Sequence, residues 1–260
     1  MEHRHALADD SGHPVRDGKR RDDRLDVSPV TLFLDFDGTL ARVRPRPDQV
    51  ALDPATRRVL RRLAHSRRVR VCIISGRRLD DVRSRVRVPG VKFLGLHGWE
   101  NTAGRKLNAP AGLLIKDACA EVERALRGLA GIWIEEKVAS FAVHYRGVDT
   151  PTRRQARQAL TAVIEPLAGA LRVLYGDQVW EVVPREVRGK AAAARRRARV
   201  FRGALPVYAG NDGTDEPAFH ALARGITIRV GRQRPSRARF LVRDPAEVRQ
   251  FLERLLEEVQ

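Results

Sequence analysis

Two aspartates separated by one residue follow an apolar run near the start of the chain. Asp35 and Asp37 belong to the sequence LFLDFDGTL (32–40), and the run Val30 to Leu34 that leads into them predicts a fully buried strand. Both carboxylates can face the opening at the end of such a strand, where they would repel each other unless a cation lay between them. Gly38 allows a sharp turn whose amides can point at phosphate oxygens. The motif predicts a divalent metal and a phosphate group at one site.

Two further polar groups end later apolar runs. Ser75-Gly76-Arg77 follows the run 69–74, and the sequence GNDGTDE (210–216) follows the run 205–209. Taken alone, the first motif could be an ordinary acidic turn and Ser75 could be a helix N-cap. Parallel strands end at one edge of a sheet, where open α/β sheets bind their ligands. Three such groups at one edge therefore favour a ligand site over coincidence.

The elements that must position these groups follow from the apolar pattern. Runs at 30–34, 69–74 and 91–96 predict buried strands, and the segments beginning at Asp53-Pro54 and at Leu79 predict the helices between them. Strand, helix and strand in alternation are typical of an α/β domain with a parallel sheet. The same pattern returns from about residue 189, with a terminal helix at 245–259.

The middle of the chain has a different pattern. Helices near 113–129 and 152–167 alternate with pairs of β-like runs at 132–137, 141–146, 171–175 and 179–183, which predicts an antiparallel sheet. We predict an α/β fold with a doubly wound, Rossmann-like core of parallel strands (28–106 and 185–260) and an inserted α+β cap domain (107–184). Residues 1–27 are polar and predict a flexible basic tail.

Composition limits the class of protein. The chain has 260 residues, 43% hydrophobic and 32% charged, with no apolar run long enough to cross a membrane and no apolar segment typical of a secretion signal. We expect a cytoplasmic protein without a membrane partner. The two cysteines support neither a disulfide framework nor a zinc site. The formal charge of +18 comes from arginines spread along the chain, so we expect no specific nucleic-acid partner, only nonspecific binding to polyanions at low salt.

Taken together, LFLDFDGTL, SGR and GND-x-TDE resemble the haloacid dehalogenase (HAD) superfamily of phosphohydrolases over roughly residues 28–260. The resemblance implies that Asp35 attacks phosphorus to form an aspartyl phosphate, and that Asp37 protonates the leaving oxygen and later activates water. It implies a Mg²⁺ ion held by Asp35, by Asp37 and by the late acidic cluster. The phosphate-binding residues that it implies are Gly38, Thr39, Ser75, Gly76 and Arg77.

The chain departs from the superfamily pattern at two places. The late motif usually has two aspartates after its glycine, whereas this chain has Asn211 and then Asp212, so either residue, together with Asp215, is a candidate metal ligand. The expected Lys-Gly appears as Arg188-Gly189-Lys190. Either cation could balance the charge of the phosphoaspartate, and we favour Lys190 because its flexible stem carries a point charge.

The inserted segment carries motifs that concern the substrate. GLHGWE (95–100), EEK (135–137), HYR (144–146) and EVVP (181–184) are similar, in order and spacing, to trehalose-6-phosphate phosphatases. The similarity implies a sugar-phosphate substrate bound by Glu100, Lys137, His144, Arg146 and Glu181. Trp99 and Trp180 could stack on a sugar or fill the core, and we favour the core for Trp180.

Other functions remain open from the sequence. The same chemistry could act on mannosyl-phosphoglycerate, on sucrose phosphate or on a simple hexose phosphate, and a phosphomutase is a further alternative. A further alternative is a different class of protein, a basic binding protein whose phosphatase site has decayed. In that case the replacement of the usual aspartate by Asn211 would be the first sign of the decay. We expect a monomer that acts on a small molecule.

Overall fold

Six parallel strands form the larger of two sheets. The computed structural model describes residues 29–44, 46–101, 109–137, 139–231 and 235–259. The strand order β10-β9-β8-β1-β2-β3 places the first strand between two strands that are distant in sequence. The strands are β1 (Val30–Leu34), β2 (Val69–Ile74), β3 (Lys92–Leu94), β8 (Leu205–Gly210), β9 (Ile226–Val230) and β10 (Phe240–Val242).

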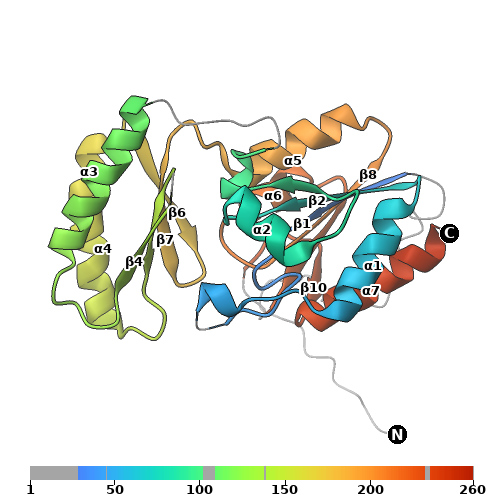
Figure 1. The fold of residues 1–260 in the computed structure, drawn as a ribbon, viewed down its shortest axis with the longest axis horizontal. Helices are drawn as coiled ribbons and strands as arrows, with labels where there is room; N and C mark the ends of the chain where they lie inside the picture. The colour runs from blue at the N-terminus through green and yellow to red at the C-terminus, as the bar shows by residue number, and fades with distance from the viewer. Residues whose placement is uncertain (1–28, 45, 102–108, 138, 232–234, 260) are drawn as a thin grey trace, which may run out of the picture.

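Helices cover both faces of this sheet, which is why its central strands are mostly apolar. One face packs on α1 (Pro54–His65), α2 (Leu79–Val86) and α7 (Pro245–Glu258), and the other on α5 (Gly189–Val200) and α6 (Glu216–Ala221) (Figure 1). The predicted start of α1 is confirmed, because the Asp53 side chain accepts a hydrogen bond from Thr56 N.

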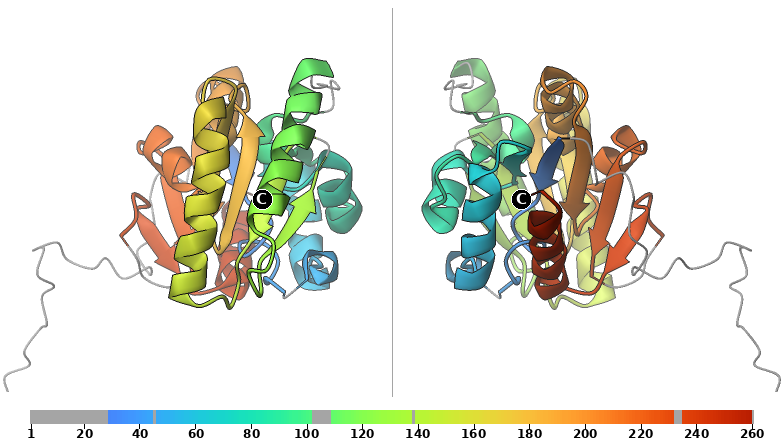
Figure 2. Two further views of the ribbon diagram at one scale, coloured as in Figure 1. Left: turned by 90° about the vertical axis from the view of Figure 1, so that its left-hand side faces the viewer. Right: turned by 90° about the vertical axis from the view of Figure 1, so that its right-hand side faces the viewer.

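A smaller lobe interrupts this core. Its antiparallel sheet has the order β4-β5-β7-β6, and α3 (Ala109–Ala125) and α4 (Thr150–Ile164) cover the face that points away from the core (Figure 2). Its strands are β4 (Trp133–Glu136), β5 (Phe141–His144), β6 (Leu171–Gly176) and β7 (Val179–Pro184). The opposite face of this sheet is turned towards the carboxyl edge of the core sheet (Figure 1).

The predicted α/β class, with a parallel doubly wound sheet and an added antiparallel sheet, is confirmed. Three strands are shorter than predicted: β4 and β5 are each two residues shorter than the predicted runs 132–137 and 141–146, and β3 is three residues shorter than 91–96. β3 ends at Leu94 because Leu96 and His97 have positive φ angles of 45° and 56°, and Leu96–Gly98 form a 3-10 turn, η3. Further 3-10 turns are η2 (Pro47–Gln49) and η4 (Glu165–Leu167).

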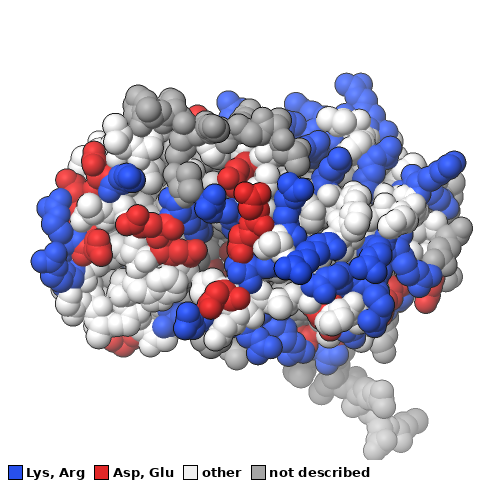
Figure 3. Space-filling view, in the orientation of Figure 1, with Lys and Arg blue, Asp and Glu red and all other residues white. Residues whose placement is uncertain are grey.

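Several predictions are not tested by this structure. The tail at 1–27 lies outside the described residues, as does the predicted boundary at 106–107, so the residue bounds of the lobes stay predictions. Within the described part of the chain, no helix combines the length and apolar character needed to span a bilayer. The expected cytoplasmic location and monomeric state stay predictions. Arginine and lysine side chains cover much of the visible face of the larger lobe (Figure 3), in keeping with the charge of +18.

Candidate active site

Asp35 lies at the carboxyl end of β1, the strand at which the order of the sheet reverses. Its Oδ1 accepts a hydrogen bond from Lys190 Nζ at 2.8 Å, and its Oδ2 accepts one from Thr39 Oγ1 at 3.2 Å. Lys190 stands in the first turn of α5 and is buried, whereas Arg188 is exposed. The structure therefore places Lys190, and not Arg188, beside the predicted nucleophile.

Asp215 completes this buried cluster. Its Oδ1 accepts hydrogen bonds from Lys190 Nζ (2.9 Å) and from the Tyr208 hydroxyl (2.8 Å). Its Oδ2 accepts from the backbone amides of Asn211 and Asp212 at 3.0 and 3.2 Å. These four bonds fix the loop after β8, and Asp215 does not line the cavity, so the contacts give it a positioning role; its predicted role as a metal ligand stays a prediction.

Burial dominates the electrostatics of this cluster. Loss of water raises the pKa of Asp35, against the opposing charge of Lys190, and the charges of Asp215 and Asp212 raise it further. Burial alone would lower the pKa of Lys190, but the carboxylates of Asp215 and Asp35 outweigh it, so the pKa lies well above its usual value. Lys190 is therefore a permanent cation between two carboxyl groups.

Asp37 is held in place by one guanidinium group. Arg77 donates from Nε and Nη2 to the two carboxylate oxygens of Asp37, each at 2.7 Å. The same group donates to Asp81 Oδ2 at 2.7 Å and to the carbonyl oxygen of Pro47 at 2.8 Å. Arg77 lines the cavity, but in this structure it orients Asp37, and its predicted contact with phosphate stays a prediction.

Two oxygen atoms of the first motif face the Asn211 side chain. With its amide turned to suit these neighbours, Asn211 donates from Nδ2 to Asp35 Oδ2 at 3.0 Å and to the backbone oxygen of Asp37 at 2.8 Å. The Asp212 carboxylate is instead held by the backbone amide and the hydroxyl of Thr214 (2.8 and 2.6 Å). The described residues contain no group of three His, Cys, Asp or Glu side chains placed to bind a metal. One carboxylate, one carbonyl and one amide oxygen are nevertheless the hard donors that suit Mg²⁺.

Only some of the residues predicted to bind phosphate line the cavity beside Asp35. Gly38 has a φ of 81°, and a Cβ there would lie 2.2 Å from the Asn211 amide, so only glycine fits this turn. Ser75 is buried, and its Oγ accepts a hydrogen bond from Arg77 N at 3.1 Å. Gly76 lines the cavity, whereas Thr39 and Ser75 lie behind its wall.

A cavity of about 340 Å³ lies between the two lobes. Asp35, Asp37, Lys190 and Asn211 form part of its wall on the core side. On the other side, the strand register brings one face of the smaller sheet to the cavity. The residues of that face are Trp133, Glu135, Ala142, His144, Leu174, Gly176, Val179 and Glu181.

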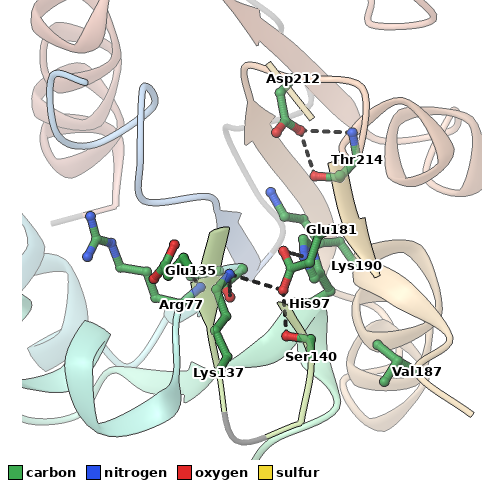
Figure 4. Close-up of polar contacts among 12 residues, drawn as sticks. Arg77, His97, Glu135, Lys137, Ser140, Glu181, Val187, Lys190, Asp212 and Thr214 are labelled. Carbon is green, nitrogen blue, oxygen red and sulfur yellow. Dashed lines mark hydrogen bonds and ion pairs between the residues drawn. The ribbon is translucent and has the colours of Figure 1, made fainter. Parts of the chain in front are cut away.

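Glu181 joins the two lobes (Figure 4). Its Oε2 accepts a hydrogen bond from His97 Nε2 of the core at 2.8 Å, and its Oε1 accepts from Lys137 Nζ (3.0 Å) and Ser140 Oγ (2.9 Å). Burial alone would raise the pKa of Glu181, but the charges of Lys137 and His97 outweigh it and hold the pKa well below its usual range. Two of the predicted substrate residues, Lys137 and Glu181, are therefore partners of each other at the junction of the lobes.

The other three predicted substrate residues are placed differently from one another. His144 lines the cavity, with its Nε2 3.0 Å from Glu135 Oε2. Arg146 lies at the rim, 3.6 Å from the carboxylate of Asp177. Glu100 does not line the cavity, because its Oε2 accepts a hydrogen bond from Leu79 N and caps the start of α2.

Several residues of the cavity wall lie outside the predicted set, among them His97, Glu135 and Trp133. His97 belongs to the GLHGWE motif, for which the sequence predicts only Glu100 as a site residue, and Glu135 belongs to EEK, for which it predicts only Lys137. Trp133 was not predicted at all. Since residues two apart in a strand share a face, the series Trp133, Glu135, Lys137 could have indicated both of the missing β4 residues.

The sequence matches the family described as Trehalose-phosphatase over residues 33–245. A protein described as "Uncharacterized glycosyl hydrolase" of Mycobacterium tuberculosis is 37% identical over an alignment of 249 positions that covers 88% of this chain and 18% of that protein. The trehalose-phosphate phosphatase of the same organism is 32% identical over an alignment of 255 positions that covers 92% of this chain and 64% of that enzyme. The chain thus spans less than two thirds of the length of these relatives. The solved C-terminal domain of the Candida albicans trehalose-6-phosphate phosphatase has the same fold, with a TM-score of 0.77 at 20% identity, covering 90% of this chain and 94% of that one.

Proposed function

The chain belongs to the trehalose-phosphatase family of the haloacid dehalogenase superfamily, and from this premise we propose that it hydrolyses trehalose 6-phosphate to trehalose and inorganic phosphate. The observation that carries the proposal is the position of Asp35. Its buried carboxylate, paired with Lys190, borders a cavity whose opposite wall is the polar face of the smaller sheet. A phosphate group placed at Asp35 would have its sugar directed at that wall.

In the proposed reaction, an oxygen of Asp35 attacks phosphorus, and the bond from phosphorus to the sugar oxygen breaks as Asp37 gives that oxygen a proton. Water then attacks the aspartyl phosphate, Asp37 takes the proton of that water, and phosphate leaves with Asp35 restored. Arg77 donates to both carboxylate oxygens of Asp37 and so holds it in a fixed orientation for both steps. The first step requires that Asp37 first take up a proton.

Asp35, the carbonyl oxygen of Asp37 and Asn211 are the residues that would hold Mg²⁺, with the Asn211 amide rotated so that its oxygen, in place of its nitrogen, faces the other two oxygens. When bound, the ion would neutralise charge on the phosphoryl oxygens. Lys190 would also help to neutralise charge on the phosphoryl oxygens, from the Oδ1 side of Asp35, because it stays protonated and is buried in the cluster.

Release of phosphate from trehalose 6-phosphate, with and without Mg²⁺, tests the proposal. We expect the highest kcat/KM with trehalose 6-phosphate, and no turnover once a chelator removes the metal. Mannosyl-phosphoglycerate, sucrose phosphate and glucose 6-phosphate serve as comparison substrates. A clear preference for one of these three, or isomerised sugar phosphate in place of free phosphate, would refute the assignment.

Asn211→Asp is expected to tighten Mg²⁺ binding about tenfold, since affinity rises with the number of charged ligands. Without metal the second carboxylate would lie beside Asp35 Oδ2, so the melting temperature of the metal-free variant should fall. Calorimetric titration with Mg²⁺ and thermal melting with and without the ion measure both effects. Gln49→Glu adds the same charge at an exposed site and should change neither. Unchanged Mg²⁺ affinity in Asn211→Asp would exclude Asn211 as a ligand.

Gly213→Ala is expected to lower kcat/KM for trehalose 6-phosphate about 10- to 100-fold, because a misplacement of about 1 Å at a site can cost that much. A Cβ at Gly213 would lie 2.6 Å from the carbonyl oxygen of Tyr175 in β6, so the smaller lobe would have to move away from the 211–214 loop. Gly169→Ala, where a Cβ meets nothing within 4 Å, is the matched control. Equal kinetics of the two variants would show that this close approach does not matter for turnover.

A further inference from the structure

Trp133 is the exposed aromatic side chain of the cavity. It lies on β4, the edge strand of the smaller sheet, opposite His144 in the register of β5. Its exposed fraction is 44%, whereas Trp99 and Trp180 are exposed by only 6% and 4%. Of the three tryptophans of the chain, only Trp133 can therefore offer a ring face to a ligand.

The indole of Trp133 is held flat by its neighbours. It stacks on the imidazole of His144, with ring centroids 3.9 Å apart and ring planes 7° from parallel. His144 is in turn fixed by its bond to Glu135 Oε2 at 3.0 Å. Because His144 covers one face of the indole, the exposed area belongs to its other face and its edges, and Trp133 is one of the residues that line the cavity.

A flat aromatic surface beside charged groups suits a sugar ring. The ring of a hexose carries C–H groups on its faces, and burying these against an aromatic plane is favourable because it removes apolar surface from water. The hydroxyls around the edge of the ring need polar partners. Glu135, two residues away on the same face of β4, offers a carboxylate acceptor for such hydroxyls. Arg146, also in the wall of the cavity, offers donors.

We propose that Trp133 is a specificity-determining residue on whose free indole surface a sugar ring of the substrate stacks, with His144 and Glu135 holding the indole in position. The inference rests on the proposed function, since it concerns the sugar end of the same cavity. The alternative is that Trp133 has a purely structural role, since a stacked cross-strand pair such as Trp133 and His144 can also serve only to stabilise the sheet.

Acrylamide quenching of tryptophan fluorescence separates these roles. Trp99 and Trp180 are buried, so the quenchable emission comes from Trp133. We expect trehalose 6-phosphate, added to the Asp35→Asn protein, to lower the quenching constant at least twofold, whereas inorganic phosphate leaves it nearly unchanged. Unprotected Trp133 at a ligand concentration that calorimetry shows to be saturating would overturn the inference.

Steady-state kinetics provide the second test. In Trp133→Ala the ratio of kcat/KM for trehalose 6-phosphate to that for p-nitrophenyl phosphate should fall about tenfold, mainly through KM, and Trp133→Phe should restore most of it. Leu113→Ala, which removes an exposed apolar side chain from α3 of the same lobe, should leave the ratio unchanged. A Trp133→Ala variant whose ratio is unchanged would refute the inference, whether or not both activities fall together. Wild-type protein without turnover of trehalose 6-phosphate would refute the proposed function instead, and the quenching test then continues with whichever sugar phosphate is hydrolysed.

Discussion

Replacement of Asp35 by asparagine is expected to lower phosphate release by a factor of about 10⁴ or more, as loss of a nucleophile does in other enzymes that form a covalent intermediate. An amide cannot form the aspartyl phosphate. The fold should persist, because Lys190 keeps its ion pair with Asp215 at 2.9 Å and is not left as an unpaired buried charge. Since burial and two nearby carboxylates already raise the pKa of Asp35, removing its charge should leave the melting temperature equal or slightly higher.

Phosphate release and thermal melting of Asp35→Asn measure the two effects on one sample. Asp117→Asn, at an exposed position of α3, is the control and should match the wild type in both. Near-normal turnover of Asp35→Asn would refute the assignment of the nucleophile. An inactive wild type that binds polyanions would instead support a basic binding protein with a decayed site.

The core could be predicted because its physical causes are local. The segment Val30–Leu34 has four apolar residues and one threonine and no charge, which predicts burial on both sides, and such strands meet at one edge of a parallel sheet. Asp35, Asn211 and Lys190, which come from three distant segments, are therefore neighbours as the motif spacing predicted. The length of β3 was overestimated, since apolar residues at 95–96 do not reveal that Leu96 and His97 turn the backbone into the left-handed region.

The partner of each charged side chain could not be predicted in the same way. The sequence does not distinguish a glutamate that binds a sugar hydroxyl from one that binds a backbone amide. In the structure, Glu100 accepts a hydrogen bond from the backbone amide of Leu79. The arginine of SGR could meet phosphate or a carboxylate, and Arg77 meets Asp37 across 40 residues of sequence. Such choices depend on tertiary distances that neither propensity nor periodicity contains.

The position of Trp133 depends on how two strands pair. In sequence, Trp133 and Ile134 form one apolar pair that could face either side of the sheet. The register with β5 turns Ile134 towards the helices and Trp133 towards the cavity. A slip of one residue would exchange the two, so the cavity face is fixed by pairing and not by composition.

Replacement of Lys190 by methionine is expected to damage both stability and turnover. It leaves the carboxyl groups of Asp35 and Asp215 buried without their shared cation, and loss of one partner of a buried ion pair costs about 3 to 5 kcal/mol. At about 2 to 4 °C per kcal/mol for a domain of this size, the melting temperature should fall by roughly 6 to 20 °C. Turnover should fall at least about 10²-fold, because the charge of Lys190 is the strongest influence that opposes the rise in the pKa of Asp35, and without it the attacking carboxylate forms less readily.

Thermal melting and phosphate release at a temperature where the variant is folded separate these two losses. Lys92→Met, which removes the same charge from an exposed position of β3, should lower neither quantity appreciably. The double variant Lys190→Met with Asp35→Asn should recover part of the lost stability, since it removes one of the two orphaned carboxylates, while it stays inactive. A Lys190→Met variant as stable as the wild type would show that another group compensates for the loss of the cation. Normal turnover in this variant would show that Lys190 has no part in preparing Asp35 for attack.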